Sequence, residues 1–263
     1  MPLKEYREKR DFKRSPEPRG EERPGARRRT KGRTRFFCVQ KHLATQLHYD
    51  FRLEHNGVLL SWAVPKGPSL DSSVKRLAMH VEDHPIDYGT FEGVIPEGYG
   101  AGIVMLWDHG TWEPQVDDID AAIEKGDLKF TLDGYKLKGS WVLVRTRGTP
   151  GGGGAGGPAP SQSWLLIKHR DDWSGPLDIS TFAPNSVKSG GGFRDILSQE
   201  APDVWLSNRG NSSSASIQTL RRLIERVEKL EPLTEPEEAT EKQTPGTTRS
   251  ARTSTPQRKA RKP

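Results

Sequence analysis

Hydrophobic and polar residues alternate strictly along residues 47–53, LHYDFRL, as in a β-strand with one buried face. The odd positions are all hydrophobic, whereas the even positions are His48, Asp50 and Arg52. Because successive side chains of a strand point to opposite faces, the pattern predicts one face in a core. The other face would carry an imidazole, a carboxylate and a guanidinium side by side.

Short hydrophobic segments of this kind recur from Arg35 to about residue 182. They include residues 76–82 (RLAMHVE) and 88–95 (YGTFEGVI), and Gly, Pro or Asp separate them. HNGV and DGY are hairpin turn signals, and only residues 118–126, DIDAAIEKG, are typical of a short helix. Short strands at regular spacing, without long helices between them, predict an all-β antiparallel barrel or sandwich over residues 35–182.

The segments outside this region have a different composition. Residues 1–34 are rich in charged residues, Pro and Gly, which predicts an arm that is only partly ordered. Residues 148–160, GTPGGGGAGGPAP, predict a flexible loop between the last two strands. Residues 183–263 predict a C-terminal extension with one amphipathic helix at about 216–230, which we expect to pack on the barrel, and a basic disordered tail. The hydrophobic stripe of that helix consists of Ile217, Leu220, Leu223, Ile224, Val227 and Leu230.

Basic residues are concentrated at the two ends of the chain. Residues 1–35 contain 14 Lys and Arg against 6 Asp and Glu, and residues 242–263 contain 7 Lys and Arg and no acid. The net charge of the whole chain is +6, so the middle is acidic. Basic ends on an acidic body fit a polyanionic partner such as nucleic acid, and they also fit a role in solubility alone.

The single cysteine, Cys38, lies in the hydrophobic run FFCV, which predicts a buried structural thiol and excludes an internal disulfide framework. No hydrophobic stretch reaches the length of a membrane span, and the N-terminus is charged rather than signal-like. These features predict a cytoplasmic protein without a membrane partner. The basic ends add the expectation that it associates with the nucleoid.

Two further segments show the same alternation of hydrophobic and polar residues, which predicts a strand with one polar face in each. In residues 36–42, FFCVQKH, the polar face holds Gln40 and His42. In residues 76–84, RLAMHVEDH, the hydrophobic residues stand at odd positions and the polar set is Arg76, His80, Glu82 and His84. Outward strand positions usually hold Thr, Lys, Glu or Ser, so a gathering of His, Asp and Arg indicates a bound ligand.

A metal ion is one candidate for that ligand, because mixed imidazole and carboxylate donors suit Mn, Zn or Fe(II). His48 and Asp50 are placed to bind one ion together, and Arg52 beside them is placed to hold an anion, which favours phosphoryl chemistry. Two other hypotheses stay open on spacing alone. One is a facial-triad Fe(II) oxygenase, and the other is a non-catalytic nucleic-acid-binding module, which would need no metal cluster.

Two long stretches add a resemblance to a known family. QKHLATQLHYDFRLEHNGVLLSWAVPKGPS and HVEDHPIDYGTFEGVIPEGYGAGIVMLWDHGTWE closely resemble the 3′-phosphoesterase module of bacterial DNA ligase D, a module that also occurs as a free-standing protein. YREKRDFKRSPEP resembles the lead-in segment of the family and WLLIKHRDDW its last strand, so the resemblance covers about residues 4–180. It implies a single antiparallel barrel of about eight strands, with an apolar interior and the active site on its outer surface.

The resemblance also implies an activity, the healing of DNA 3′ ends in non-homologous end joining. A 3′-terminal ribonucleoside is removed, and the remaining 3′-phosphate is hydrolysed to a 3′-hydroxyl. Mn²⁺ is the implied metal, and other divalent metals are compatible with the same ligands. The sequence has no polymerase segment and no nucleotidyl-transfer lysine motif, so we expect end-joining proteins such as Ku, a ligase and a polymerase to act in trans.

The site residues follow from the resemblance by position. The family's metal ligands match His42, His48 and Asp50. The groups that hold the scissile phosphate match Arg52, His84 and Tyr88. Arg52 would clamp the phosphate oxygens, His84 would be a phosphate ligand and general acid, and Tyr88 would donate a hydrogen bond. Positions that support the substrate match Arg10, Asp11 and Glu17 of the lead-in segment and Lys66, Arg76 and Glu82 of the barrel. The tail beyond residue 185 lies outside the resemblance, and from its charge we expect the basic residues of 242–263 to tether the enzyme to DNA.

Overall fold

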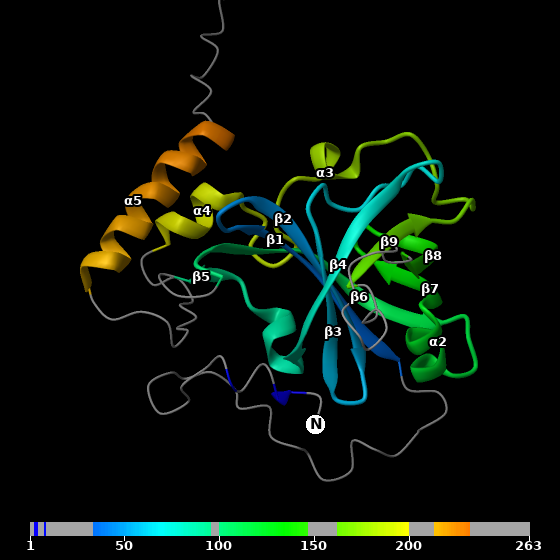
Figure 1. The fold of residues 1–263 in the computed structure, drawn as a ribbon. Helices are drawn as coiled ribbons and strands as arrows, with labels where there is room; N and C mark the ends of the chain where they lie inside the picture. Colours follow the sequence, from blue (N-terminus) through cyan, green and yellow to red (C-terminus); the bar gives the residue numbers. More distant parts are fainter. Residues whose placement is uncertain are drawn as a thin grey trace, which may run out of the picture. The chain divides into compact units, whose positions relative to one another are not determined.

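Nine antiparallel strands form one sheet that closes into a barrel (Figure 1). The computed structural model describes residues 34–95, 100–146, 162–199 and 213–231, together with Leu3, Lys4 and Glu8. The strands are β1 (Arg35–Leu43), β2 (Leu47–His55), β3 (Val58–Val64), β4 (Lys75–Pro85), β5 (Gly93–Ile95), β6 (Gly102–Pro114), β7 (Asp127–Gly134), β8 (Lys138–Arg145) and β9 (Ser163–Lys168). The helices are the 3₁₀ helix η1 (Ile86–Thr90), α2 (Ile119–Lys125), α3 (Ile179–Phe182), α4 (Phe193–Ser198) and α5 (Ser213–Leu230).

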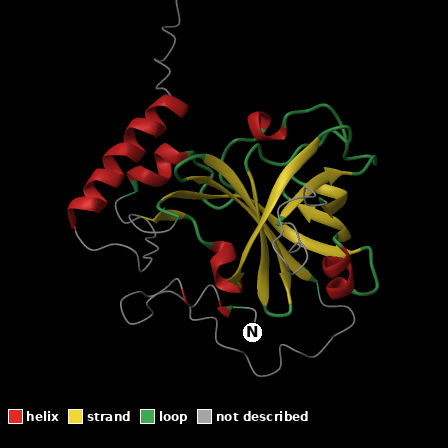
Figure 2. Ribbon diagram, viewed as in Figure 1, coloured by secondary structure: helices red, strands yellow, loops and turns green. Residues whose placement is uncertain are grey.

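The barrel closes because β1 pairs with β2 on one side and with β6 on the other. The order around the ring is β1-β2-β3-β4-β9-β8-β7-β6, so eight strands form the barrel and β5 pairs with the first part of β6 outside it. The predicted antiparallel barrel of about eight strands is confirmed. Figure 2 shows the helices around the outside and ends of this sheet.

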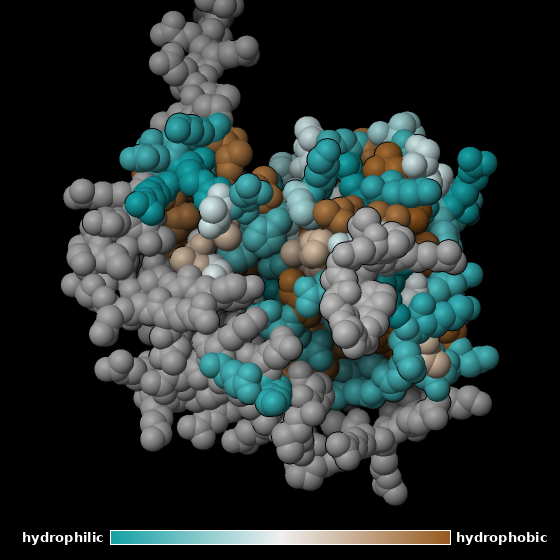
Figure 3. All heavy atoms as spheres, in the orientation of Figure 1, coloured by the Kyte–Doolittle hydropathy of each residue, from teal (hydrophilic) through white to brown (hydrophobic). Residues whose placement is uncertain are grey.

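Hydrophobic side chains at alternate strand positions fill the interior of the barrel. In β2, Tyr49, Phe51 and Leu53 all belong to the main hydrophobic core, as the alternation of residues 47–53 predicts. Trp62 of β3 is fully buried beside them. The visible surface of the described residues is mainly hydrophilic, with hydrophobic side chains in small separate groups (Figure 3).

Over most of β4 the two faces are the reverse of the prediction, so that even-numbered residues face the core and odd-numbered residues face outward. Ala78 is fully buried and the ring of His80 packs against a buried tryptophan of β3, whereas Leu77 is 45% exposed. The pairing of β3 with β4 shifts register next to Ser61. Such a bulge adds one residue to a strand, so the residues beyond it change face. His84 lies beyond the shift and faces outward, as predicted.

Residues 88–95 were predicted as one strand and instead form two elements. Pro85, with an extended backbone (φ −62°, ψ 149°), directly precedes the 3₁₀ helix η1. Within residues 88–95 only Gly93–Ile95 form a strand. The helix predicted for residues 118–126 is confirmed as α2. The Asp118 carboxylate accepts the backbone N–H of Ala121 in the first turn of α2, and Gly126 ends the helix in the left-handed conformation (φ 80°).

The segments after β9 close one end of the barrel. Their buried hydrophobic side chains belong to the same core as the strands: Ile179, Phe193, Ile196, Leu223 and Val227. In the stripe predicted for the C-terminal helix, Ile224 and Leu230 are 45% and 48% exposed, so the buried face of α5 is narrower than expected. The side chains of Ile217 and Leu220, the glycine-rich loop and the basic tail lie outside the described residues.

None of the helices in the described ranges combines the length and the hydrophobicity that a membrane-spanning helix needs.

Candidate active site on the outer wall of the barrel

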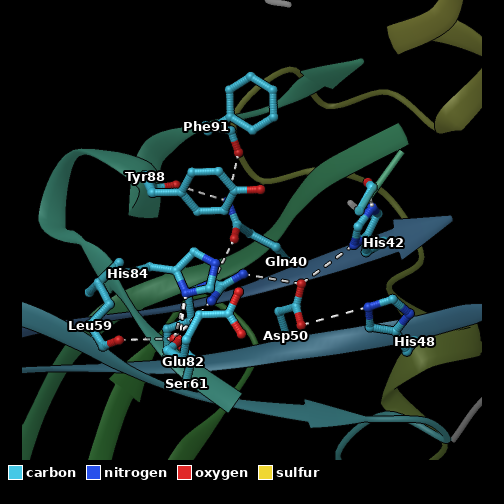
Figure 4. A network of polar contacts seen from close by, with 12 residues as sticks. Gln40, His42, His48, Asp50, Leu59, Ser61, Glu82, His84, Tyr88 and Phe91 are labelled. Atoms are coloured by element: carbon cyan, nitrogen blue, oxygen red, sulfur yellow. Dashed lines mark hydrogen bonds and ion pairs between the residues drawn. The ribbon is translucent and has the colours of Figure 1, made fainter. Parts of the chain in front are cut away.

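Three side chains of β1 and β2 converge on the outer wall of the barrel: His42, His48 and Asp50 (Figure 4). One possible ligand atom from each lies within 4.8 Å of the others. His42 Nδ1 is 3.6 Å from Asp50 Oδ2, and His48 Nε2 is 3.7 Å from Asp50 Oδ1. The strand pairing explains this convergence, because His42 lies directly opposite His48, and Asp50 is the next residue of β2 on the same face.

Both imidazoles are held by backbone carbonyls through the nitrogen that points away from Asp50. His42 Nε2 is 2.9 Å from the carbonyl oxygen of Gly100, and His48 Nδ1 is 2.9 Å from that of Gln46. A carbonyl only accepts, so each contact assigns the ring proton to that nitrogen of the neutral ring. The other nitrogens, His42 Nδ1 and His48 Nε2, then present lone pairs toward Asp50, as in metal-binding histidines.

The charge of Asp50 is set by its neighbours. Burial alone would raise its pKa, but the Arg52 guanidinium, whose Nη2 lies 3.2 Å from Oδ2, lowers it. In the protonated form of either ring, His42 and His48 would lower it further, and the pKa of Asp50 lies well below its usual range. Asp50 is therefore a carboxylate at neutral pH, the form that binds a metal ion.

Arg52 is almost completely buried, with 2% of its surface exposed, although it lies on the outer wall. Its Nε donates to Gln40 Oε1 (2.9 Å) and its Nη1 to Ser61 Oγ (2.8 Å), while the ring of Tyr88 covers it at 5.1 Å. Gln40, which is fully buried, donates its Nε2 hydrogens to the carbonyls of Tyr88 and Phe91 (3.0 and 2.9 Å). Gln40 therefore joins the guanidinium to the backbone of η1.

His84 and Tyr88 complete the polar layer on the side away from the histidine pair (Figure 4). Their rings lie 5.0 Å apart, and both residues are buried. His84 Nδ1 is 2.8 Å from the carbonyl oxygen of Glu82 and 3.5 Å from Ser61 Oγ. A continuous chain of contacts thus runs from Asp50 through Arg52 and Ser61 to His84.

The remaining predicted positions are placed as follows. Glu82 contributes its backbone carbonyl to His84. Lys66 is exposed just beyond the end of β3, and Arg76 lies near the start of β4, opposite a residue of β9. Within the described residues, no hydrogen bond joins Lys66 or Arg76 to the metal-ligand candidates or to Arg52. The predicted positions of the lead-in segment, Arg10, Asp11 and Glu17, lie outside the described residues.

Sequence reasoning placed Gln40 on the polar face but gave it no role. The signal was present, because a glutamine between hydrophobic residues of β1 and in phase with His42 has to be satisfied where it is buried. Cys38 has the same phase and is buried, as predicted. Burial raises the pKa of its thiol to about 12, which keeps the thiol protonated and excludes it as a nucleophile at neutral pH.

Comparison with known proteins gives consistent matches. A model of the DNA ligase D 3′-phosphoesterase domain matches residues 40–145. The multifunctional non-homologous end joining protein LigD of Pseudomonas aeruginosa is 52% identical over 194 residues, which cover 72% of this chain and 21% of LigD. The protein of the same name from Mycobacterium bovis is 44% identical over 147 residues, 56% of this chain and 18% of that protein. The chain thus spans about a fifth of the length of these relatives.

Proposed function

Because the chain belongs, through residues 40–145, to the DNA ligase D 3′-phosphoesterase domain family, we propose that it is a metal-dependent phosphoesterase that heals DNA 3′ ends. It would remove 3′-terminal ribonucleosides and 3′-phosphates and leave the 3′-hydroxyl that end joining requires. The family match supports an end-processing role in DNA repair. The choice of substrate and the metal dependence are our proposal.

His42, His48 and Asp50 are suited to hold the metal ion. Hydrogen bonds to the carbonyls of Gly100 and Gln46 hold His42 Nε2 and His48 Nδ1, so the other nitrogen of each ring faces the ionised Asp50. We propose Mn²⁺ for this site, and the donor set also suits Zn²⁺ and Fe²⁺. A bound divalent ion would polarise a phosphate oxygen and lower the pKa of a water molecule.

Arg52 and its neighbours are suited to the phosphate. The three described contacts of Arg52 use three of its five N–H groups, and the guanidinium would offset negative charge that develops on the phosphate oxygens. The Glu82 carbonyl holds the Nδ1 proton of His84. As a general acid His84 would therefore act in its doubly protonated form, giving the Nε2 proton to the leaving oxygen and keeping the one at Nδ1. The hydroxyl of Tyr88 would donate a hydrogen bond to the phosphate.

One observation carries the proposal more than any other. The carboxylate of Asp50 contacts both imidazoles and the Arg52 guanidinium, so the candidate metal ligands and the candidate anion-binding group share one side chain. A metal and an adjacent fixed cation are the two features that phosphoryl transfer needs around one phosphate. A pure DNA-binding module would gain nothing from this pairing of the buried His42 with the half-buried His48 around one carboxylate.

The location on an outer wall fits a large substrate. A DNA end is too large to enter an eight-stranded barrel that is filled with side chains. We propose that the 3′ end lies across β1 and β2 beside η1, and that a ligase, a polymerase and Ku act on the healed end in trans. The basic residues of 1–35 and 242–263 would add sequence-independent attraction to phosphates.

The test uses two primer-templates with Mn²⁺, one that ends in a 3′-ribonucleotide and one that ends in a 3′-phosphate. We expect the purified protein to convert both to 3′-hydroxyl ends, and His42→Ala or Asp50→Ala to abolish the conversion. His55→Ala is the matched control, because His55 lies on the same strand but contacts Asp120 of α2 at 2.7 Å. It should retain wild-type conversion.

Two other outcomes would replace the proposal. If folded, metal-loaded protein binds the primer-template but converts neither end, the barrel is a DNA-end-binding module. If the protein consumes 2-oxoglutarate with Fe(II), the two histidines and one carboxylate form the facial triad of an oxygenase.

A further inference from the structure

The residues that follow α3 contact both sides of the candidate site. We call residues 183–231 the clasp, of which 183–199 and 213–231 are described, and they lie beyond the residues that match the family model. The clasp is part of the barrel core, because Phe193 and Ile196 of α4 and Leu223 and Val227 of α5 pack into it. Its position relative to the barrel is thus fixed by buried hydrophobic surface.

The helices α4 and α5 of the clasp are joined to each other by one residue. The Glu231 carboxylate accepts the backbone N–H groups of Phe193 and Arg194, each at 3.0 Å, and the Arg194 side chain donates to the Glu231 carbonyl at 2.7 Å. These contacts satisfy the free N–H groups at the start of α4. The start of α4 is therefore bonded to the residue that follows α5.

The first contact of the clasp with the site is made by α5. Arg226 Nη1 donates to the carbonyl oxygen of Ala44. Ala44 begins the turn of residues 44–46 that joins β1 to β2, and this turn lies between His42 and His48 in the sequence. The carbonyl of Gln46 in the same turn holds the ring of His48. Arg226 thus holds the turn whose Gln46 carbonyl orients the ring of His48.

The second contact is made by residues 183–192. Ser186 Oγ donates to Glu92 Oε2 at 2.5 Å, and both side chains are buried. The same oxygen of Glu92 accepts the backbone N–H of Leu106 at 2.8 Å, and the Lys188 ammonium lies 3.3 Å from the carbonyl oxygen of Thr90. Glu92 and Thr90 flank Phe91, directly after η1. This contact therefore holds the element that carries Tyr88.

We propose that the clasp sets the geometry of the site from two sides, with Arg226 as a positioning residue for the metal ligands and Ser186 as a positioning residue for the phosphate side. The inference rests on the proposed function for the assignment of those two sides. It follows from the separation of the two contacts. Among the described residues, the side-chain hydrogen bond from Arg226 to the barrel goes to the β1–β2 turn, and that from Ser186 goes to Glu92 after η1. If the clasp contributed only to overall stability, loss of either contact would weaken metal binding and phosphate binding together.

The experiment measures two dissociation constants on the full-length protein, one for Mn²⁺ alone and one for inorganic phosphate at saturating Mn²⁺. Arg226→Ala should weaken Mn²⁺ binding about tenfold, the usual loss when an outer-shell partner of a metal site is removed, and leave phosphate affinity at saturating Mn²⁺ unchanged. Ser186→Ala should weaken phosphate binding several-fold and leave Mn²⁺ affinity unchanged. Arg226→Lys keeps a donor of similar reach and should restore most of the Mn²⁺ affinity.

Two exposed residues of the clasp supply matched controls. Arg222 lies one turn before Arg226 on the same helix, and Ser189 lies three residues after Ser186. Arg222→Ala and Ser189→Ala should leave both dissociation constants at wild-type values. Circular dichroism and the melting temperature establish that each variant is folded. If Arg226→Ala does not fold, the comparison of Arg226→Lys with Arg222→Lys gives the same test on a smaller scale.

The outcomes separate this inference from the proposed function. If the wild type binds Mn²⁺ and Arg226→Ala binds it equally well, the positioning role of Arg226 is wrong while the proposed function stands. If either variant weakens both ligands in parallel with its loss of stability, the clasp is only a structural support. If the wild type binds no Mn²⁺, both the proposed function and the role of Arg226 are contradicted.

Discussion

The Nη2 atom of Arg52 lies 3.2 Å from Oδ2 of Asp50. Both side chains lie on the outer wall of the barrel, and both residues are buried. Through this contact a candidate metal ligand and a candidate phosphate-binding group hold each other in place. The contact also accounts for the low pKa of Asp50, which burial would otherwise raise. The metal side and the phosphate side of the site therefore depend on a single ion pair.

Replacement of Arg52 by lysine tests this arrangement. A lysine ammonium is a point charge and cannot reproduce the planar set of contacts with Asp50, Gln40 and Ser61. We expect kcat on a 3′-phosphate end to fall by a factor of roughly 100 or more, the usual cost of removing a group that stabilises transition-state charge. Steady-state kinetics measure this directly. A lysine variant with near-wild-type kcat would show that only the charge matters.

The side chain of Gln40 is expected to matter as much for stability as for activity. Gln40→Ala removes the acceptor of the buried Arg52 Nε and one hydrogen bond each from the carbonyls of Tyr88 and Phe91. We expect the free energy of unfolding to fall by about 2 kcal/mol. Urea denaturation measures the change. Gln115→Ala, which removes only exposed hydrogen bonds, should change it by well under 1 kcal/mol.

Any side chain at Gly102 is predicted to be destabilising, because the backbone of Leu43 and Ala44 packs closely against this glycine. A Cβ at this position would lie 2.4 Å from the carbonyl oxygen of Leu43 and 2.9 Å from the Cα of Ala44, and these backbone atoms cannot move independently of the site. Gly102→Ala should therefore force β6 away from β1 beside His42, at a cost of roughly 1–3 kcal/mol, and weaken Mn²⁺ binding.

The thermal stability and the Mn²⁺ affinity of Gly102→Ala check this prediction. Gly175→Ala is the control, because a Cβ there meets nothing within 4 Å. If Gly102→Ala matches Gly175→Ala in both measurements, the spacing between β1 and β6 does not restrain the site.

The buried carboxyl of Asp108 predicts a pH dependence of stability. It accepts the backbone N–H groups of Lys136 (3.0 Å) and Leu137 (2.8 Å), and burial raises its pKa from 3.8 to about 6 despite these bonds. Between these two values the folded state binds more protons than the unfolded state. The contribution of Asp108 is therefore fully present below about pH 4 and is lost as the pH rises through 6, by about 3 kcal/mol at most.

Urea denaturation at several pH values between 4 and 7 checks this sign. Asp108→Asn removes the titrating group, so the difference in unfolding free energy between wild type and variant should change across this window. The variant should lose its largest amount of stability, relative to wild type, at the acid end. A difference that is constant with pH would mean that Asp108 titrates alike in the folded and unfolded states.

The sequence predicted those parts of the fold and site that depend on local alternation. The faces of β2 follow from residue parity, so Tyr49 and Phe51 were placed in the core correctly. The phase of β4 could not be predicted, because the bulge beside Ser61 has no residue signature in this chain. His80 was therefore assigned to the polar face, although its ring lies against buried tryptophans.

Long-range contacts explain the rest of what the sequence left out. Gln40 bonds carbonyls that are 48 and 51 residues away, and Arg226 bonds one that is 182 residues away. Such pairs form only after the barrel has closed and α5 has packed against it. The phase of Gln40 indicates that its side chain needs partners, but no spacing along the chain indicates which carbonyls Gln40 and Arg226 bond.

The most direct test of the account is a Mn²⁺ titration of the DNA-free protein followed by electron paramagnetic resonance. We predict one tightly bound ion in the wild type and in His55→Ala. The affinity should fall by at least about 100-fold, the upper end of what loss of an outer-shell partner costs, in His42→Ala, His48→Ala and Asp50→Asn. Equal Mn²⁺ binding in the wild type and these three variants would contradict the claim that the outer wall of this barrel holds the metal.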